Sequence, residues 1–342
     1  MSYAKERAEK QRKVKRIKRI VFGIVSVLLV GFCVLAVIIP PDNWKFYIST
    51  PSVASRNAGE LRVHFIDVGQ GDATLIEFPD GKTALIDTGN GSAESDKALL
   101  RHLNALSVSK IDYLILTHLD ADHIGGVDEL LDNKKIGKAF LPVNLPSKTD
   151  DYDYATLEYI LTKARCEYTV ACPTSQAHLE TDLNGYGDYR YTFAFVYPNS
   201  SIVDGMGSEL LENVNETSIN IWLDYQGVSF LFTGDSDYAI EDKIQLHATS
   251  GVLKGVDLSA TEILKVAHHG ADGSTGKSFL EFLQVKTAVI SCGEENIYKH
   301  PHAEVCKRIK DAGAELYRTD KNGTVLITAK ANGTYSVATL GK

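Results

Sequence analysis

Residues 113–126 read YLILTHLDADHIGG and change abruptly from apolar to polar after Thr117. The apolar half is typical of a buried strand, and the closing glycines are typical of a loop that opens a helix. Between them stand four side chains of the metal-ligand type: His118, Asp120, Asp122 and His123. Unpaired carboxylates are costly to bury, and such groups on one loop repel each other unless a cation lies among them. The stretch therefore predicts a metal site at a strand end and disfavours a solvated polar loop.

The spacing within this loop favours more than one metal ion. His118 and Asp120 are two residues apart, which places them on one side of an extended loop. Asp122 and His123 then turn to the other side. One loop could therefore serve two metals.

Three further predicted strands end in residues of the same kind. Asp235 follows the apolar run 228–233, and His268 and His269 follow the run ILKVA. The segment NIYKHPH (296–302) follows the run TAVIS and contains His300. Each signal alone is weak, because Gly-Asp turns and histidine pairs are common. Four strand ends that present His or Asp together make coincidence improbable, and they predict a shared site at one edge of the sheets.

The rest of the chain has ordinary globular composition, since 44% of its 342 residues are hydrophobic and 23% are charged. Collagen-like, low-complexity and wholly disordered proteins are thereby excluded. Strands are expected at 61–67, 73–78, 83–87, 113–117, 190–197, 218–225, 228–233, 263–267, 286–291 and 323–329. Helices are expected around 94–106, 154–165, 237–247, 276–284 and 302–312. This order predicts an α/β (α+β) fold of mixed sheets with helices outside. Residues 144–189 are interpreted as an insertion or surface lobe.

The net charge of −8 is an average over two unlike parts. Residues 1–19 hold nine basic and two acidic side chains, which leaves 27 basic and 42 acidic side chains in the other 323 residues. Residues 20–39 follow without a charge and are long enough to cross a membrane. A buried core helix is disfavoured because no polar face exists. A cleaved signal peptide is the stronger rival, but no small-x-small cleavage site follows directly.

The positive-inside rule then sets the predicted topology. Residues 1–19 form a cytoplasmic tail, 20–39 a single-pass transmembrane signal anchor, 40–60 a linker and 61–342 an extracytoplasmic domain. The five cysteines are Cys33, Cys166, Cys172, Cys292 and Cys306. An exported domain permits disulfides, and Cys166–Cys172 and Cys292–Cys306 are the local choice. No CxxC pair is present, which disfavours a thiolate zinc site.

Three motifs in order along the chain resemble the metallo-β-lactamase superfamily: Asp87-Thr-Gly89, Thr117–Gly126 and Thr233-Gly-Asp235. Asp120 stands where the superfamily motif has a third histidine. Together with FIDVGQGD (65–72), Asn215-x-x-Ser218, His268-His-Gly and Asn296-x-Tyr298-x-His300-Pro301, this departure resembles the ComEC-like branch. The resemblance covers about residues 61–330. It implies an αββα sandwich with two divalent metal ions between the sheet edges.

The resemblance also suggests roles for single residues. His118 and Asp120 would hold one metal, Asp122 and His123 the other, Asp235 would bridge them, and His268 would complete a shell. Asp122 would also orient the attacking hydroxide, while His269 and His300 are second choices as ligands and could contact a phosphoryl group. Asp87, Asn215, Asn296 and Tyr298 are expected to brace ligands or contact substrate. Asn215 stands where the family's usual third-motif histidine would be sought. Asp67, Gln70 and Asp72 are expected as turn and hydrogen-bond formers, and His64, His102, His178 and His247 are assigned no role.

The resulting functional prediction is a membrane-anchored phosphodiesterase. An oxygen-rich ligand set moves the metal preference towards Mn²⁺ and leaves Zn²⁺ open. A nuclease acting on DNA is the version nearest the family, although the acidic outer domain argues against a polyanion. DNA transport is not implied, because the many-helix channel of the competence protein is absent from this sequence. An envelope phosphoesterase acting on phosphocholine groups and a non-catalytic binding module are the alternatives. The sequence does not indicate an oligomeric state.

Overall fold

The computed structural model describes residues 2–39, 41–48, 50–144, 153–171, 178–179, 189–198, 214–253 and 255–341. The chain divides into two compact units, Met1–Ile48 and Ser49–Lys342. Half of the predicted lobe at 144–189 lies outside the described residues, but its expected helix at 154–165 is confirmed as α5, Tyr154–Lys163.

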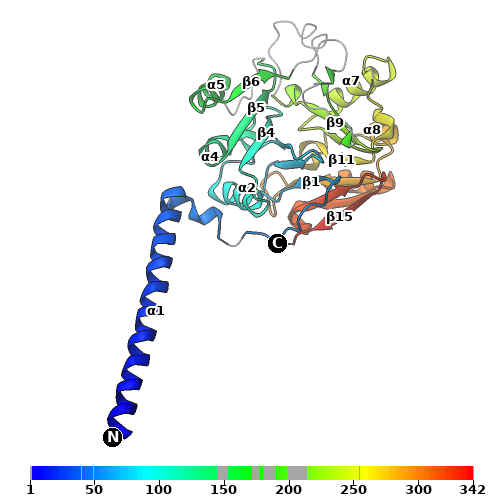
Figure 1. The fold of residues 1–342 in the computed structure, drawn as a ribbon. Coiled ribbons are helices and arrows are strands. Elements are labelled where there is room, and N and C mark those ends of the chain that lie inside the picture. Colours follow the sequence, from blue (N-terminus) through cyan, green and yellow to red (C-terminus); the bar gives the residue numbers. More distant parts are fainter. Residues whose placement is uncertain are drawn as a thin grey trace. The chain divides into compact units, whose positions relative to one another are not determined.

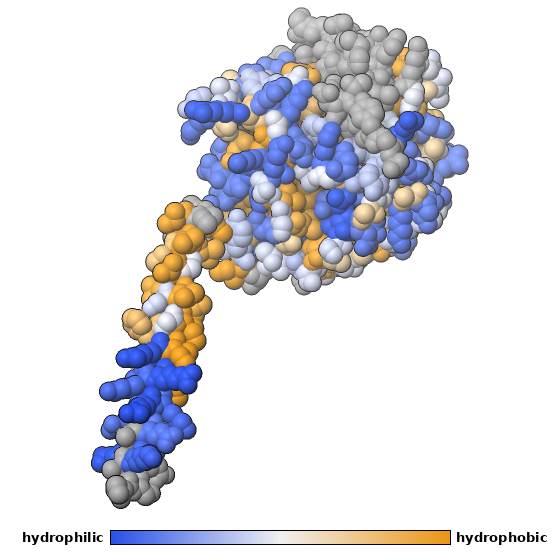
Figure 2. All heavy atoms as spheres, in the orientation of Figure 1, coloured by the Kyte–Doolittle hydropathy of each residue, from blue (hydrophilic) through white to orange (hydrophobic). Residues whose placement is uncertain are grey.

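The first unit is dominated by one helix, α1, Ser2–Ile38, which is followed by the short helix η1, Pro41–Phe46. Its segment Glu9–Val37 is long and apolar enough to cross a membrane, judged by length and composition. The helix continues without a break through the basic tail, because Ala, Glu, Lys and Arg favour helix and no Gly or Pro interrupts residues 2–19. Figure 2 shows the change from hydrophilic to hydrophobic side chains along it.

The second unit contains two mixed sheets. The first sheet has the strand order β15-β14-β1-β2-β3-β4-β5-β6. Its pairs are antiparallel from β15 to β3 and parallel from β3 to β6. Its strands are β1 (Leu61–Phe65), β2 (Thr74–Glu77), β3 (Thr83–Ile86), β4 (Lys110–Ile115), β5 (Lys135–Leu141), β6 (Glu167–Val170), β14 (Val325–Ala329) and β15 (Tyr335–Thr339).

The second sheet has the strand order β13-β12-β11-β10-β9-β8-β7. It is parallel from β13 to β10 and antiparallel from β10 to β7. Its strands are β7 (His178–Leu179), β8 (Tyr191–Tyr197), β9 (Asn220–Tyr225), β10 (Val228–Phe232), β11 (Ile263–Lys265), β12 (Thr287–Ile290) and β13 (Glu315–Arg318).

The two sheets pack face to face, and helices cover their outer faces (Figure 1). One apolar core joins alternate residues of both sheets, and in it the rings of Phe65 and Phe232 lie 6.2 Å apart. A second core packs the outer face of the second sheet against α7 (Tyr238–Thr249), α8 (Lys277–Leu283) and α9 (Ala303–Asp311). Helices α2 (Ala93–Ala105), α4 (Val127–Asn133) and α5 flank the first sheet (Figure 1). The short helices α3 (Ala121–Ile124), η3 (Val214–Thr217), η4 (Leu258–Ala260), η5 (Ala267–Gly270) and α10 (Thr319–Asn322) lie in loops. The predicted αββα sandwich is thereby confirmed.

The cysteine prediction is wrong for one pair. Cys292 and Cys306 are both free thiols, and Cys292 Sγ lies instead 3.3 Å from Asp320 Oδ1, to which it donates a hydrogen bond. Cys166 is also a free, buried thiol, and Cys172 lies outside the described residues.

Candidate metal centre

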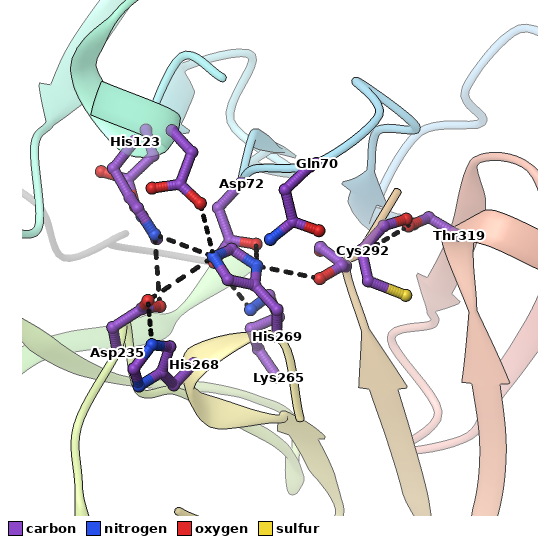
Figure 3. A network of polar contacts seen from close by, with 12 residues as sticks. Gln70, Asp72, His123, Asp235, Lys265, His268, His269, Cys292 and Thr319 are labelled. Carbon is purple, nitrogen blue, oxygen red and sulfur yellow. Dashed lines mark hydrogen bonds and ion pairs between the residues drawn. The ribbon is translucent and has the colours of Figure 1, made fainter. Parts of the chain in front are cut away.

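Four ligand side chains from four separate loops meet between the two sheets. Asp72 precedes β2, while His123, Asp235 and His269 follow β4, β10 and β11. All four are at least 96% buried, and one ligand atom of each lies within 4.8 Å of the others. His123 Nε2 lies 3.2 Å from Asp235 Oδ1 and 3.3 Å from His269 Nε2 (Figure 3). The sandwich therefore gathers oxygen and nitrogen ligands in one buried place.

His123 is held by a carboxylate on its far side. Asp87 Oδ2 lies 2.8 Å from His123 Nδ1 and accepts a hydrogen bond of 2.7 Å from Thr117 Oγ1. Asp87 Oδ1 accepts a second bond from the Thr117 backbone N–H. With its proton on Nδ1, the imidazole presents the lone pair of Nε2 to the cluster. This is the arrangement by which proteins orient metal-binding histidines.

His118 and Asp120 lie beside this cluster. His118 Nε2 is 3.5 Å from Asp120 Oδ2, and the His118 and His123 rings are 4.0 Å apart. His118 is fully buried, and its Nε2 has no hydrogen-bond partner among the described residues. Asp122 reaches the cluster from the other side of the loop, where its Oδ2 lies 3.1 Å from His269 Nε2. The structure thus brings together the four residues of the 118–123 loop that the sequence singled out.

His268 and His269 point in different directions. Both have a left-handed backbone, with φ values of 48° and 51°, so consecutive side chains diverge. His269 is buried, with Nδ1 3.0 Å from the Ser291 carbonyl oxygen. His268 is 34% exposed, and its Nε2 lies 3.8 Å from Asp235 Oδ2. Asn215 Nδ2 approaches His268 Nδ1 at 3.5 Å. His269, expected only as a second choice, is therefore the deeper of the two in the cluster.

His300 borders the site without entering the cluster. Its ring centroid lies 5.5 Å from that of His268 and 6.2 Å from that of His269. Burial, together with the positive charges of those neighbours, lowers the pKa of His300 to about 4. Asn296 shapes this loop, because its side chain donates to the His300 carbonyl oxygen and accepts from the His300 N–H. The exposed Tyr298 stacks on the His300 ring at 5.6 Å.

The sequence reasoning missed Asp72 and Lys265 as parts of the centre. Lys265 Nζ lies 2.6 Å from Asp72 Oδ2, and both side chains are buried. Burial raises the pKa of Asp72, but the charges of Lys265 and His269 outweigh it and lower that pKa below its ordinary value. The placement of Asp72 directly after Gln-Gly, before an apolar strand, was the available signal.

The electrostatics of the centre fit a divalent cation. Burial raises the pKa of Asp235, but the charges of His123 and His269 hold it well below 3.8. Burial lowers the pKa of His269, yet the charges of Asp235 and Asp72 raise it to about 10. Protons on the histidines thus compensate the carboxylates. The oxygens Asp72 Oδ1 and Asp235 Oδ1 have no hydrogen-bond partner among the described residues. Buried carboxylate oxygens and imidazole nitrogens are the donors that divalent metals take.

A model of the metallo-β-lactamase superfamily matches residues 66–294. ComE operon protein 3 of Bacillus subtilis is 31% identical over 296 residues, which cover 82% of this chain and 34% of that protein. Competence protein ComA of Neisseria gonorrhoeae is 27% identical over 267 residues, which cover 78% of this chain and 32% of that protein. The metallo-β-lactamase fold protein YhfI of Bacillus subtilis, a solved structure, aligns with a TM-score of 0.46 at 14% identity, over 81% of this chain and 100% of that one.

The chain spans about a third of the length of these curated relatives. The family match includes the loop of His118 and His123 as well as Asp235 and His269, which is the set of loops that the fold brings together. The chain therefore belongs to the metallo-β-lactamase superfamily and is a ComEC-like member of it.

Proposed function

We propose that the chain is a membrane-anchored, metal-dependent hydrolase of phosphodiester bonds. One observation carries this proposal: four buried ligand side chains from four loops meet within 4.8 Å of one another, and one imidazole is braced by a carboxylate behind it. Asp72 Oδ1 and Asp235 Oδ1 make no hydrogen bond among the described residues and lie at ion-pair distance from His269 and His123, an arrangement that suits metal ligands.

The residues divide between two metal positions. His118 and Asp120 would hold one ion, and Asp122 and His123 would hold the other. Asp235 would bridge them, and Asp72 and His269 would add further ligands, since their side chains lie in the same cluster. His268 stands at its exposed side. When bound, two divalent ions, Mn²⁺ or Zn²⁺, would supply Lewis acidity and a nucleophile at neutral pH.

The protein's own groups would position the reaction. Asp87 fixes the tautomer of His123 through Nδ1. Asp122, whose side chain is 26% exposed at the mouth of the site, would orient the nucleophile and accept its proton. Tyr298 lines the cavity that Asp122 also lines, and its ring stacks on His300.

DNA is the first substrate to test, because the relatives are a ComE operon protein and a competence protein by name. The acidic outer part of the chain works against a polyanion, and Lys265 is buried on Asp72 and so cannot receive a phosphate. The rim of the site carries Glu295 and the exposed Tyr298, which suit a cationic group. A phosphocholine ester is therefore the second candidate substrate.

The apolar helix segment Glu9–Val37 supports the anchor. Nine basic side chains precede residue 20, which favours a cytoplasmic N-terminus and an extracytoplasmic domain. Protease treatment of intact cells and of inverted vesicles tests this topology. Cleavage of the domain in inverted vesicles alone would contradict it.

The activity is tested with the full chain in detergent. Bound metal is measured, and a bis-aryl phosphodiester, single-stranded DNA and a phosphocholine ester are assayed with and without Mn²⁺. We expect metal-dependent hydrolysis that is lost when Asp122→Ala and His123→Ala are combined. A matched pair outside the site, Asp311→Ala with His247→Ala, should leave it unchanged. Absence of bound or activating metal, or activity surviving in the first pair, would overturn the proposal.

A further inference from the structure

We propose that the side-chain amide of Gln70 donates a hydrogen bond to an oxyanion held at the metal cluster. Gln70 lies in the loop between β1 and β2, two residues before Asp72. The inference rests on the proposed function for the identity of the oxyanion as a phosphoryl oxygen. Its structural basis is independent, because it comes from a buried donor that lacks an acceptor.

The orientation of the Gln70 amide is fixed by its neighbour. Its Oε1 accepts a hydrogen bond of 3.1 Å from the Gly293 N–H. A flipped amide would set two donors against each other, so the oxygen must lie on this side. Its Nε2 then faces away from Gly293, and Figure 3 shows it turned towards Asp72 and His269. Nε2 is buried and has no hydrogen-bond partner in the described part of the chain.

The position of the amide is also fixed by the backbone. The Gln70 carbonyl oxygen accepts a bond of 2.8 Å from Asn90 Nδ2. Gly293 approaches so closely that an added Cβ would lie 2.6 Å from the Gln70 backbone nitrogen. Contacts from two different loops therefore hold Nε2 in place, and a solvent-exposed, mobile glutamine is excluded.

The chemistry of the unpaired atom identifies what it binds. An amide N–H cannot ligate a cation, and leaving it buried without an acceptor is costly. The neighbouring oxygens Asp72 Oδ1 and Asp235 Oδ1 also lack hydrogen-bond partners, and they are the atoms a cation would take. An acceptor carried by a bound ligand would satisfy this donor. A cavity of about 390 Å³ beside the cluster is lined by Gln70 and Asp122 among others.

A preorganised neutral donor suits a phosphate-type oxyanion, because it stabilises developing negative charge without adding a charge of its own. Gln70 is thus assigned as a catalytic residue that touches the phosphoryl oxygen, beside the metal ligands. A water molecule in the same place is the alternative that the experiment must separate.

Two variants of the full chain test this role. Gln70→Glu keeps an oxygen for the Gly293 N–H but removes the donor, and Gln70→Met removes the donor without adding charge. Gln226→Glu, at an exposed turn, is the matched control for charge. The readouts are bound metal, the Kd of inorganic phosphate for the Mn²⁺-loaded chain by calorimetry, and kcat on a bis-aryl phosphodiester.

We expect both Gln70 variants to weaken phosphate binding at least about tenfold and to lower kcat about 100-fold, with metal content unchanged in the uncharged Gln70→Met. Phosphate binding and kcat within twofold of wild type in both variants would overturn the inference, because the amide then meets only water. A loss of bound metal in parallel with the loss of phosphate binding would also overturn it, because Gln70 would then only position the metal ligands. A wild-type chain that binds no phosphate would overturn it as well. A wild-type chain that binds phosphate through Gln70 but hydrolyses no phosphodiester would overturn the proposed function alone.

Discussion

Lys265 Nζ lies 2.6 Å from Asp72 Oδ2, and both side chains are more than 90% buried beside the metal cluster. The ammonium group occupies one oxygen of the carboxylate and leaves Oδ1 to face the cluster, where it lies 3.4 Å from His269 Nδ1. The pair therefore compensates negative charge at the centre when no cation does so, and it directs Asp72 to offer a single oxygen.

Replacement of Lys265 by Met is expected to destabilise the metal-free chain by about 3–5 kcal/mol, because Asp72 is left as a buried charge without its partner. With Mn²⁺ bound, the loss should be smaller, since the cation compensates Asp72. Urea unfolding in chelator and in Mn²⁺ measures both values. Lys286→Met removes an exposed ion pair with Glu262 and should have little effect in either condition. An equal loss with and without metal for Lys265→Met would contradict this explanation.

Replacement of Asp87 by Asn should weaken metal binding about 10- to 100-fold. The Asn amide offers an N–H where Asp87 Oδ2 now meets His123 Nδ1, so the imidazole proton would move to Nε2 and block the metal-binding lone pair. Competition with a chelating dye measures the affinity. Asp112→Asn is the control, because Asp112 also accepts a backbone N–H, from Thr83, but lies on β4 away from the cluster. Unchanged affinity in Asp87→Asn would show that the tautomer does not matter.

The sequence was sufficient to predict the layers and most of the loops whose His and Asp side chains meet in the buried cluster. The apolar runs before His118 and Asp235 proved to be strands, β4 and β10, whose ends lead into the cluster. The strands that were not predicted have weak patterns of their own. β5 begins Lys135-Ile-Gly-Lys138 and is held by parallel pairing with β4 and β6. The local sequence of β5 does not indicate this pairing.

The choice between His268 and His269 could not be predicted for a related reason. Both stand at the same strand end, and only their left-handed backbone and the Ser291 carbonyl decide which ring is buried. Asp72 was missed because its burial depends on Lys265, nearly two hundred residues away in the other sheet. Long-range pairing of charged groups leaves no periodic trace in a sequence.

The contribution of the cluster to the stability of the metal-free chain should be largest between about pH 4 and 6.5. Asp122 and Asp235 have a lowered pKa in the folded chain, so the stability they contribute is present above about 3.8 and is lost in acid. The pKa of His269 is raised to about 10, and that of His123 is also raised. Their contribution to stability is therefore complete below pH 6.5 and is lost as the pH rises towards 10.

Urea unfolding in chelator from pH 3 to pH 10 measures this profile. Mn²⁺ should remove the alkaline loss, because metal replaces the protons. A metal-free chain that gains stability from pH 6.5 to 9 would refute the assignment.

Tyr298 is expected to select the substrate. Its side chain is 57% exposed, lines the cavity that contains Asp122, and is oriented by stacking on His300. If single-stranded DNA is the substrate, a base can stack on the exposed face of the Tyr298 ring. Such stacking is worth roughly 1–3 kcal/mol, so Tyr298→Ala should lower kcat/KM at least about tenfold. Tyr298→Phe should retain activity, and Tyr159→Ala, which removes a ring on α5 that is 67% exposed, should change nothing.

The control substrate is an oligonucleotide that lacks the bases next to the cleaved bond. On this substrate, the kcat/KM of each variant should equal that of the wild type. Equal losses for Tyr298→Ala on both oligonucleotides would mean that the ring only supports His300. A loss confined to the phosphocholine ester would instead show that the ring, with Glu295 beside it, receives a cation.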